Sequence, residues 1–157
     1  MHKVEPVEPA GFTVATALAY ARRGQLEPWI HAYLLAGDWA NPALSAGLKM
    51  QRRWWHGPSQ LALDAVTRCC GSEPAMEFRM APAAWDARTG ALVAGFTSLE
   101  AIPPLIAEYR DGLLSVRDGN HRHEAIRRKG WLTCWVIVWY NSAADYEQDR
   151  ARRRCVD

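Results

Sequence analysis

The sequence predicts an α/β (α+β) domain in which a helical N-terminal layer precedes a small mixed sheet with helices. Helix caps and stops follow one another through the first third of the chain, before any clear strand. Residues 113–140 then read as an apolar run, a polar turn, a helical stretch and a second apolar run rich in Trp, Val and Ile. No repeat or linker divides the 157 residues. We therefore expect one domain, residues 1–157, with a helical part over 1–57 and a core over 58–157.

The N-terminal third carries three helix-start signals after an extended leader over residues 1–11. Thr13 is a good N-cap, and Gly24 follows the first helical pattern as a stop. Pro28 suits the first turn of a second helix, and Asn41 with the proline after it opens a third. The three helices are expected over residues 14–23, 29–36 and 42 to about 55, and His56-Gly57-Pro58 is expected to end the pattern.

The remaining elements are read from alternation and turn chemistry. Residues 61–70 fit either a helical face or a short strand, whereas residues 76–80 alternate as a half-buried strand does. Pro82 starts a further helix, which the glycines at 90 and 95 weaken. Asp111-Gly112 lies between two apolar runs and predicts a hairpin. The helix that starts at Pro82 is expected over residues 83–87 or beyond. The two strands of the hairpin are expected over residues 105–109 and 113–116, and a last polar helix after residue 141.

The segment 117–124 is the main candidate site. A glycine between a strand and a helix lets a ligand approach the backbone, and the first turn of a helix offers unpaired N–H groups at its positive end. Such an end binds phosphate. Arg122 adds a forked donor, His121 a donor or general acid/base, and Asp118 a metal ligand or a proton acceptor for a hydroxyl nucleophile. An ordinary turn with N-cap chemistry explains the same residues without any ligand.

The sequence leaves more than one interpretation for two further groups of polar residues. His121 and His123 are two apart, so they do not share a helix face, and a transition-metal site is disfavoured against a magnesium ion that arrives with a nucleotide. Glu77 and Arg79 point to the same side of the expected strand 76–80. One interpretation is that both side chains face solvent as a pair. The other is that Glu77 lies near the site and acts as a base or substrate clamp.

The stretch DGNHRHEAIRRKGW resembles the signature segment of the ParB/sulfiredoxin-like superfamily. There a strand leads into a G-x-R-R or G-x-H-R loop and a helix. Partition proteins have GERR at this place and sulfiredoxins GCHR, and the D-G-x-H-R form of the archaeal free-serine kinases is the most similar. The resemblance covers residues 103–140. It implies this superfamily's fold and a phosphate loop made of Gly119, Asn120, His121 and Arg122, with Asp118 just before it.

The resemblance also implies a nucleoside di- or triphosphate, ATP/ADP or CTP, with Mg²⁺ as cofactor. Asn120 stands where partition proteins have Glu and sulfiredoxins have Cys. An amide cannot form the sulfur intermediate of sulfiredoxin, and it lacks the carboxylate associated with nucleotide hydrolysis in partition proteins. If the protein is an enzyme, the activity that the resemblance implies is a small-molecule kinase-like phosphotransferase or an NTPase. The alternative is a non-catalytic, partition-like or regulatory module that binds nucleotide, DNA or both.

The composition of the chain limits the classes of partner that we expect it to bind. A net charge of only +2 disfavours a domain that grips a nucleic-acid backbone, although basic clusters occur at 52–53, 127–129 and 152–154. Eight tryptophans are expected mainly in the core, with some in a position to stack on a base. Four cysteines without a C-x-x-C pair predict neither a zinc ribbon nor a disulfide framework. The N-terminus does not resemble a signal peptide, so we expect a cytoplasmic protein without membrane contact.

Overall fold

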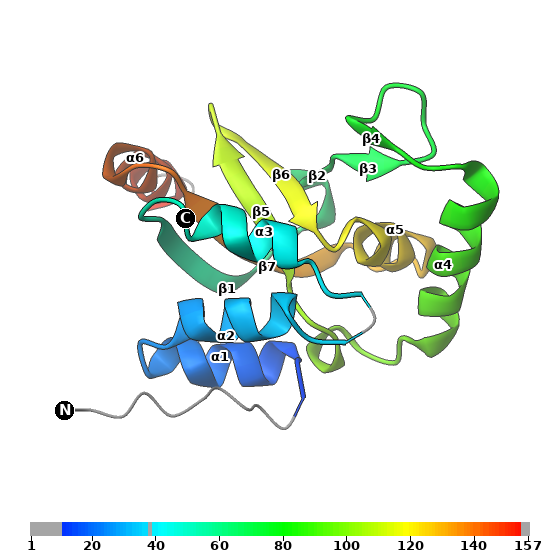
Figure 1. Ribbon diagram of the computed structural model, residues 1–157, viewed down its shortest axis with the longest axis horizontal. Helices are drawn as coiled ribbons and strands as arrows, with labels where there is room; N and C mark the ends of the chain where they lie inside the picture. Colours follow the sequence, from blue (N-terminus) through cyan, green and yellow to red (C-terminus); the bar gives the residue numbers. More distant parts are fainter. Residues whose placement is uncertain (1–10, 38, 155–157) are drawn as a thin grey trace.

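A five-stranded mixed sheet forms the centre of the protein, and helices cover both of its faces (Figure 1). The computed structural model describes residues 11–37 and 39–154. The strand order is β1-β7-β5-β6-β2, and β3 and β4 form a separate two-stranded ribbon. The strands are β1 (Trp54–Ala62), β2 (Thr67–Arg68), β3 (Cys70–Gly71), β4 (Phe78–Arg79), β5 (Leu105–Arg110), β6 (Leu113–Asp118) and β7 (Thr133–Tyr140). The α/β (α+β) class predicted from the sequence is confirmed.

Three short helices precede the sheet, as predicted. The Thr13 side chain accepts a hydrogen bond from the Thr16 backbone, and Thr16 returns one, which makes a capping box. Asn41 caps the third helix through its side chain, with Pro42 at the first helical position. The expected leader over residues 1–11 lies, except for Gly11, outside the described residues. The helices are α1 (Val14–Arg22), α2 (Leu26–Leu34), α3 (Pro42–Leu48), α4 (Pro82–Gly95), α5 (Asn120–Arg128) and α6 (Ala143–Arg154).

The expected extension of the third helix to about residue 55 is wrong. The helix ends at Leu48, and Trp54 begins β1, which pairs antiparallel with β7 so that Trp54 lies opposite Tyr140. Gly57 and Pro58 do not end this segment. The register shifts between His56 and Ser59, so the two residues form an irregularity inside one strand. Because β1 is an edge strand, the missing N–H of proline costs no hydrogen bond in the sheet interior.

The ambiguous stretch 61–70 contains no α-helix. It completes β1, passes through a 3₁₀ turn (Leu63–Ala65) and adds β2 parallel to β6. The hairpin of β5 and β6 is confirmed, and both Asp111 and Gly112 have the positive φ angles that a tight hairpin turn requires. β7 pairs parallel with β5, and α5 connects it to β6. Helix α4 runs through Gly90 and ends at Gly95, and a second 3₁₀ turn (Leu99–Ala101) follows.

The two faces of the sheet build two hydrophobic cores. Alternate residues of β5 and β7, such as Ile106 and Ile137, face α1–α3. The intervening residues, such as Ala107 and Val138, face the other side, where Ile126 of α5 and Tyr146 of α6 pack. The helical N-terminal layer therefore covers one sheet face, with α5 and α6 on the other. Helix α4 lies beside α5 at one end of the sheet (Figure 1). Among the described residues, no helix is long and apolar enough to cross a membrane.

Candidate functional site

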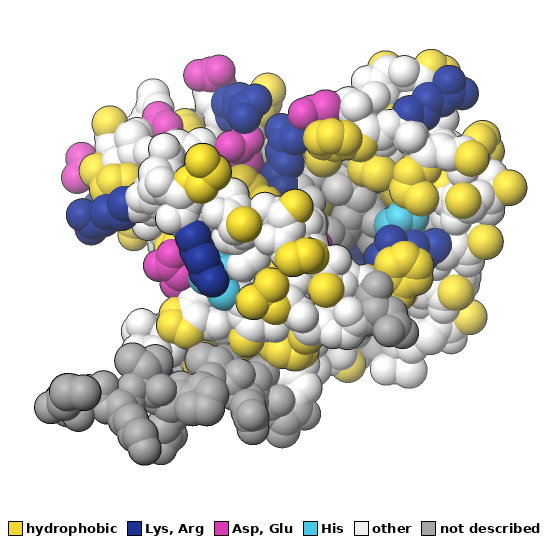
Figure 2. Space-filling model, in the orientation of Figure 1, with side chains coloured by type: hydrophobic (Ala, Val, Ile, Leu, Met, Phe, Trp, Pro, Cys, Tyr) yellow, Lys and Arg dark blue, Asp and Glu magenta, His cyan; other side chains and the backbone are white. Residues whose placement is uncertain are grey.

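Two neighbouring cavities, of about 700 and 670 Å³, meet at the start of α5. The predicted segment 118–121 lines both of them, and Arg122 lines the larger one. Further walls come from α2, α3 and the segment that joins them, from β3 and β4, and from α4 and the loop after it. Figure 2 shows a hollow on this face where arginine and histidine side chains lie next to hydrophobic ones. The residues shared by the two cavities are Trp39, Arg88, Asp118, Gly119, Asn120 and His121.

Gly119 is the N-cap of α5, and its conformation explains why a glycine stands here. Its φ is +102°, and a Cβ would lie 2.7 Å from Leu105 Cδ2 and 2.8 Å from Arg122 Nη2. No side chain caps the helix. The first N–H that reaches a carbonyl behind it is that of His123, which donates to Gly119 O at 2.8 Å. The N–H groups at the start of α5 therefore point toward the cavities without a side-chain cap.

Arg122 and Asp118 form an ion pair across the first turn of α5. Arg122 Nη2 donates to Asp118 Oδ2 at 3.3 Å and to the Pro104 carbonyl oxygen at 3.1 Å. Its guanidinium also lies over the Tyr33 ring, and its Nε is buried without a partner among the described residues. Burial raises the pKa of Tyr33 to about 12, so its hydroxyl stays protonated. Arg122 thus holds the loop together and leaves only part of its donor capacity for a ligand.

His121 is buried, yet it lines both cavities. Its ring stacks near Trp85, with centroids 4.3 Å apart, and Nδ1 lies 3.4 Å from Thr89 Oγ1. Nε2 has no hydrogen-bond partner in the described part of the chain. Burial, and then the charges of three nearby arginines, lower the pKa of His121 to about 4. At neutral pH the side chain is therefore an uncharged donor or acceptor at the cavity wall.

Arg88 of α4 is a cavity residue that sequence reasoning missed. It lines both cavities and makes no ion pair or hydrogen bond within residues 11–37 and 39–154. Its guanidinium carbon lies 3.3 Å from the centroid of the Trp39 ring. Burial, and then the charge of Arg122, lower the pKa of Arg88, and the charge of Asp118 partly opposes this effect. An anionic ligand next to Arg88 would favour its charged form further.

Asn120, expected in the phosphate loop, uses its side chain for structure. Oδ1 accepts hydrogen bonds from the backbone N–H groups of Cys69 at 2.9 Å and Cys70 at 3.2 Å. Nδ2 donates to the Val116 carbonyl oxygen at 3.1 Å. Asn120 thereby joins the start of α5 to the β2–β3 connection. Its backbone N–H stays at the helix start, so a ligand would meet the main chain at this residue.

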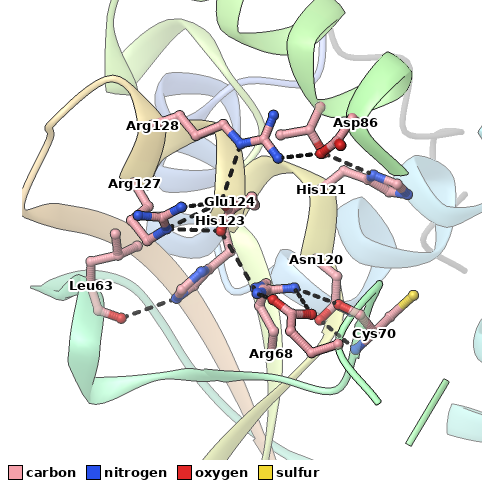
Figure 3. A network of polar contacts seen from close by, with 12 residues as sticks. Leu63, Arg68, Cys70, Asp86, Asn120, His121, His123, Glu124, Arg127 and Arg128 are labelled. Atoms are coloured by element: carbon pink, nitrogen blue, oxygen red, sulfur yellow. Dashed lines mark hydrogen bonds and ion pairs between the residues drawn. The ribbon is translucent and has the colours of Figure 1, made fainter. Parts of the chain in front are cut away.

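The rest of α5 is fixed by a network around Glu124 (Figure 3). This buried carboxylate accepts hydrogen bonds from Arg127 and Arg128, and Arg128 reaches on to Asp86 of α4 at 2.7 Å. His123 Nε2 lies 3.1 Å from the carbonyl oxygens of Leu63 and Val66. Both side chains therefore have structural partners. No group of three His, Cys, Asp or Glu side chains that could hold a metal occurs in the described residues.

Glu77, the predicted base or clamp, lies just before β4, since the ribbon strand is shorter than expected. Its carboxylate pairs with Arg117 at 2.9 Å. Glu77 lines neither cavity, although Arg117 lines the smaller one. The structure therefore brings Asp118, Gly119, His121 and Arg122 together and leaves Glu77 outside this group.

Asp118 is the single acidic residue, among those described, that lines either cavity. A magnesium ion needs only one or two carboxylates when phosphate and water oxygens complete its shell. The site fits Mg²⁺ only in this way, with Asp118 as its one carboxylate and with Arg122 already bound to Oδ2.

Most arginines of the predicted basic clusters have structural partners. Arg53 donates to the carbonyl oxygens at the end of α3, Arg127 and Arg128 bind Glu124, and Arg153 binds Asp149 at 3.0 Å. Lys129 donates to the Val93 carbonyl oxygen. These contacts within the protein occupy part of the hydrogen-bonding capacity of the clusters.

Comparison with known proteins finds similarity only among solved structures. No family model matches the chain, and no curated protein matches it. Among solved structures, it is similar to sulfiredoxin from Arabidopsis thaliana, with 19% identity, a TM-score of 0.41, and coverage of 58% of this chain and 93% of that one. The superfamily and its free-serine kinase branch stay predictions from the loop sequence. A likeness of this size says nothing about activity.

Proposed function

We propose that the cavities at the start of α5 bind the phosphate groups of a nucleoside di- or triphosphate. The observation that carries the proposal is the convergence of three anion-seeking features on one space. They are the N-terminus of α5, which no side chain caps, the guanidinium of Arg88, and Nε2 of the neutral His121. Within residues 11–37 and 39–154, Arg88 has no carboxylate partner and this Nε2 has no hydrogen-bond partner. The larger cavity, at about 700 Å³, has room for a nucleotide.

The roles follow from position. Backbone N–H groups of residues 120–122 receive phosphate oxygens, and Gly119 allows their close approach. Arg88 supplies a positive charge to the phosphates, whereas Arg122 mainly keeps the loop in shape. The bound magnesium ion would neutralise phosphate charge, with Asp118 as its protein ligand. The chemistry proposed is phosphoryl transfer or nucleotide hydrolysis, in which positioning and charge neutralisation do most of the work.

A binding module without turnover is the second candidate. It is favoured by the engagement of Asp118 with Arg122, which occupies one of the carboxylate oxygens, and by the place of Glu77 outside the cavities. Phosphate release measured with each nucleotide separates the two. Turnover that disappears in Asp118→Asn supports the enzyme, and binding with no turnover supports the module.

Thermal unfolding tests the binding proposal itself. ATP, ADP, CTP and GTP are each added with and without Mg²⁺. A ligand at about ten times its Kd should raise the melting temperature by about 3–6 °C. Arg88→Ala should abolish most of this rise, and Arg22→Ala, which removes an exposed arginine of α1, should not. No shift at millimolar nucleotide would refute the proposal.

A further inference from the structure

We infer that Trp39 is the platform on which the base of the nucleotide stacks, an inference that rests on the proposed function. Trp39 lies in the segment between α2 and α3 and is 69% exposed, which is unusual for so large an apolar side chain. It lines both cavities, as Arg88 does. The pair therefore stands at the boundary between them, next to the start of α5.

The two faces of the Trp39 ring have different surroundings. The Arg88 guanidinium covers one face at 3.3 Å from the ring centroid. The high exposure of the side chain leaves the other face open. A base can stack on an open indole face, and the guanidinium on the opposite face adds a positive charge where the phosphates would lie. The contact between Trp39 and Arg88 thus places a side chain on which a base can stack next to one that can bind phosphate.

Polar groups at the cavity wall show where the phosphates would sit relative to this platform. His121 is more than nine-tenths buried, lines both cavities, and directs an unpartnered Nε2 toward them within the described structure. Arg122 has a buried Nε without a partner. Both belong to the first turn of α5, so the anionic end of a ligand is placed there and its aromatic end at Trp39.

The walls beyond this polar end favour an aromatic body over a second charged group. The larger cavity is lined away from α5 by apolar side chains from the N-terminal segment, α4 and the following loop. Such walls leave an aromatic ring dry on its edges and offer no partner for a second charged group. The apolar residues are Phe12, Leu34, Ala84, Ala87, Leu92 and Phe96.

Calorimetric titration with ATP and with inorganic tripolyphosphate tests the inference, because tripolyphosphate has the charges without the base. Trp39→Ala should weaken ATP about tenfold or more and change tripolyphosphate less than about twofold. Trp39→Phe should restore most of the ATP affinity. Arg88→Ala should weaken both ligands. Leu132→Ala removes another highly exposed apolar side chain and should change neither.

The outcomes separate the inference from the proposed function. If both ligands bind and Trp39→Ala weakens them equally or not at all, the platform is refuted and the phosphate site stands. If neither ligand binds the natural protein, the phosphate site is refuted and the platform with it. Trp39 is exposed, so its replacement should leave the melting temperature within about 2 °C and the folded state intact.

Discussion

The side-chain oxygen of Asn120 accepts the backbone N–H of Cys69 at 2.9 Å, although the two residues are 51 positions apart. A second bond, from the N–H of Cys70, reaches the same oxygen. One buried amide therefore fixes the start of α5 against the β2–β3 connection. The residue that the loop resemblance assigns to ligand binding is, through its side chain, part of the frame of the site.

Replacing this amide should destabilise the fold. Asn120→Ala leaves two backbone N–H groups and the Val116 carbonyl without their partner. We expect the free energy of unfolding to fall by about 2–4 kcal/mol, measured by urea denaturation. Gln60→Ala, which removes an exposed side-chain hydrogen bond, is the control and should cost less than about 0.5 kcal/mol. If both variants lose the same small amount of unfolding free energy, the Asn120 side chain does not fix the start of α5 against the β2–β3 connection.

Gly119→Ala tests the backbone of the loop. At φ +102° an alanine is strained, and its Cβ meets Leu105 at 2.7 Å. The expected loss is about 1–3 kcal/mol in the free energy of unfolding, together with weaker nucleotide binding. Gly90→Ala is the matched control, because this glycine lies within α4 with open space around it. It should stabilise the protein by up to about 1 kcal/mol.

Glu124 should make stability depend on pH under acidic conditions. Burial raises the pKa of Glu124, but hydrogen bonds from Arg127 and Arg128 outweigh it and hold that pKa below its ordinary value. Its contribution is therefore complete above the unfolded value of about 4.3 and is lost as pH falls through the lower folded value. Urea unfolding between pH 7 and 3 should show this loss, and Glu124→Gln should reduce the slope below about pH 4.5. An unchanged slope in the variant would contradict this role.

His121 should remain neutral until well below its ordinary pKa of 6.5. With a folded pKa of about 4, the native state binds fewer protons than the unfolded state between these values. Stability should therefore fall as pH drops from about 6.5 to 4. The ring resonances of His121, followed by NMR, should show a midpoint near 4 that rises when tripolyphosphate is added. A midpoint of 6–7 in the protein alone would contradict the burial and the charge environment described.

The sequence predicted elements whose signals are local. Thr13 and Asn41 cap their helices, Asp111-Gly112 turns the hairpin, and Gly119 begins α5. It misassigned residues 49–55 because β1 exists through pairing with β7, far away in the chain, and not through a regular alternation of its own. Tertiary pairing decides such a segment.

The same distinction applies to the site. The loop 118–122 was found because its residues are adjacent in sequence, whereas Arg88 and Trp39 reach it from α4 and the α2–α3 connection. One weak signal for Arg88 exists, since Asp86 and Arg88 are the only charged residues in the alanine-rich helix. Asp86 pairs with Arg128, and Arg88 is left facing the cavities. Nothing local predicts which of the two would be paired.

Isothermal titration of ATP into the natural protein, Arg88→Ala and Arg22→Ala is the most direct test of the phosphate site. Arg88 is the cation without a carboxylate partner in the described structure, so its loss should weaken binding about tenfold or more while the fold stays intact. Arg22→Ala removes the same charge far from the cavities and should bind as the natural protein does. Heat of binding that is absent in the natural protein, or identical in all three, would contradict the account.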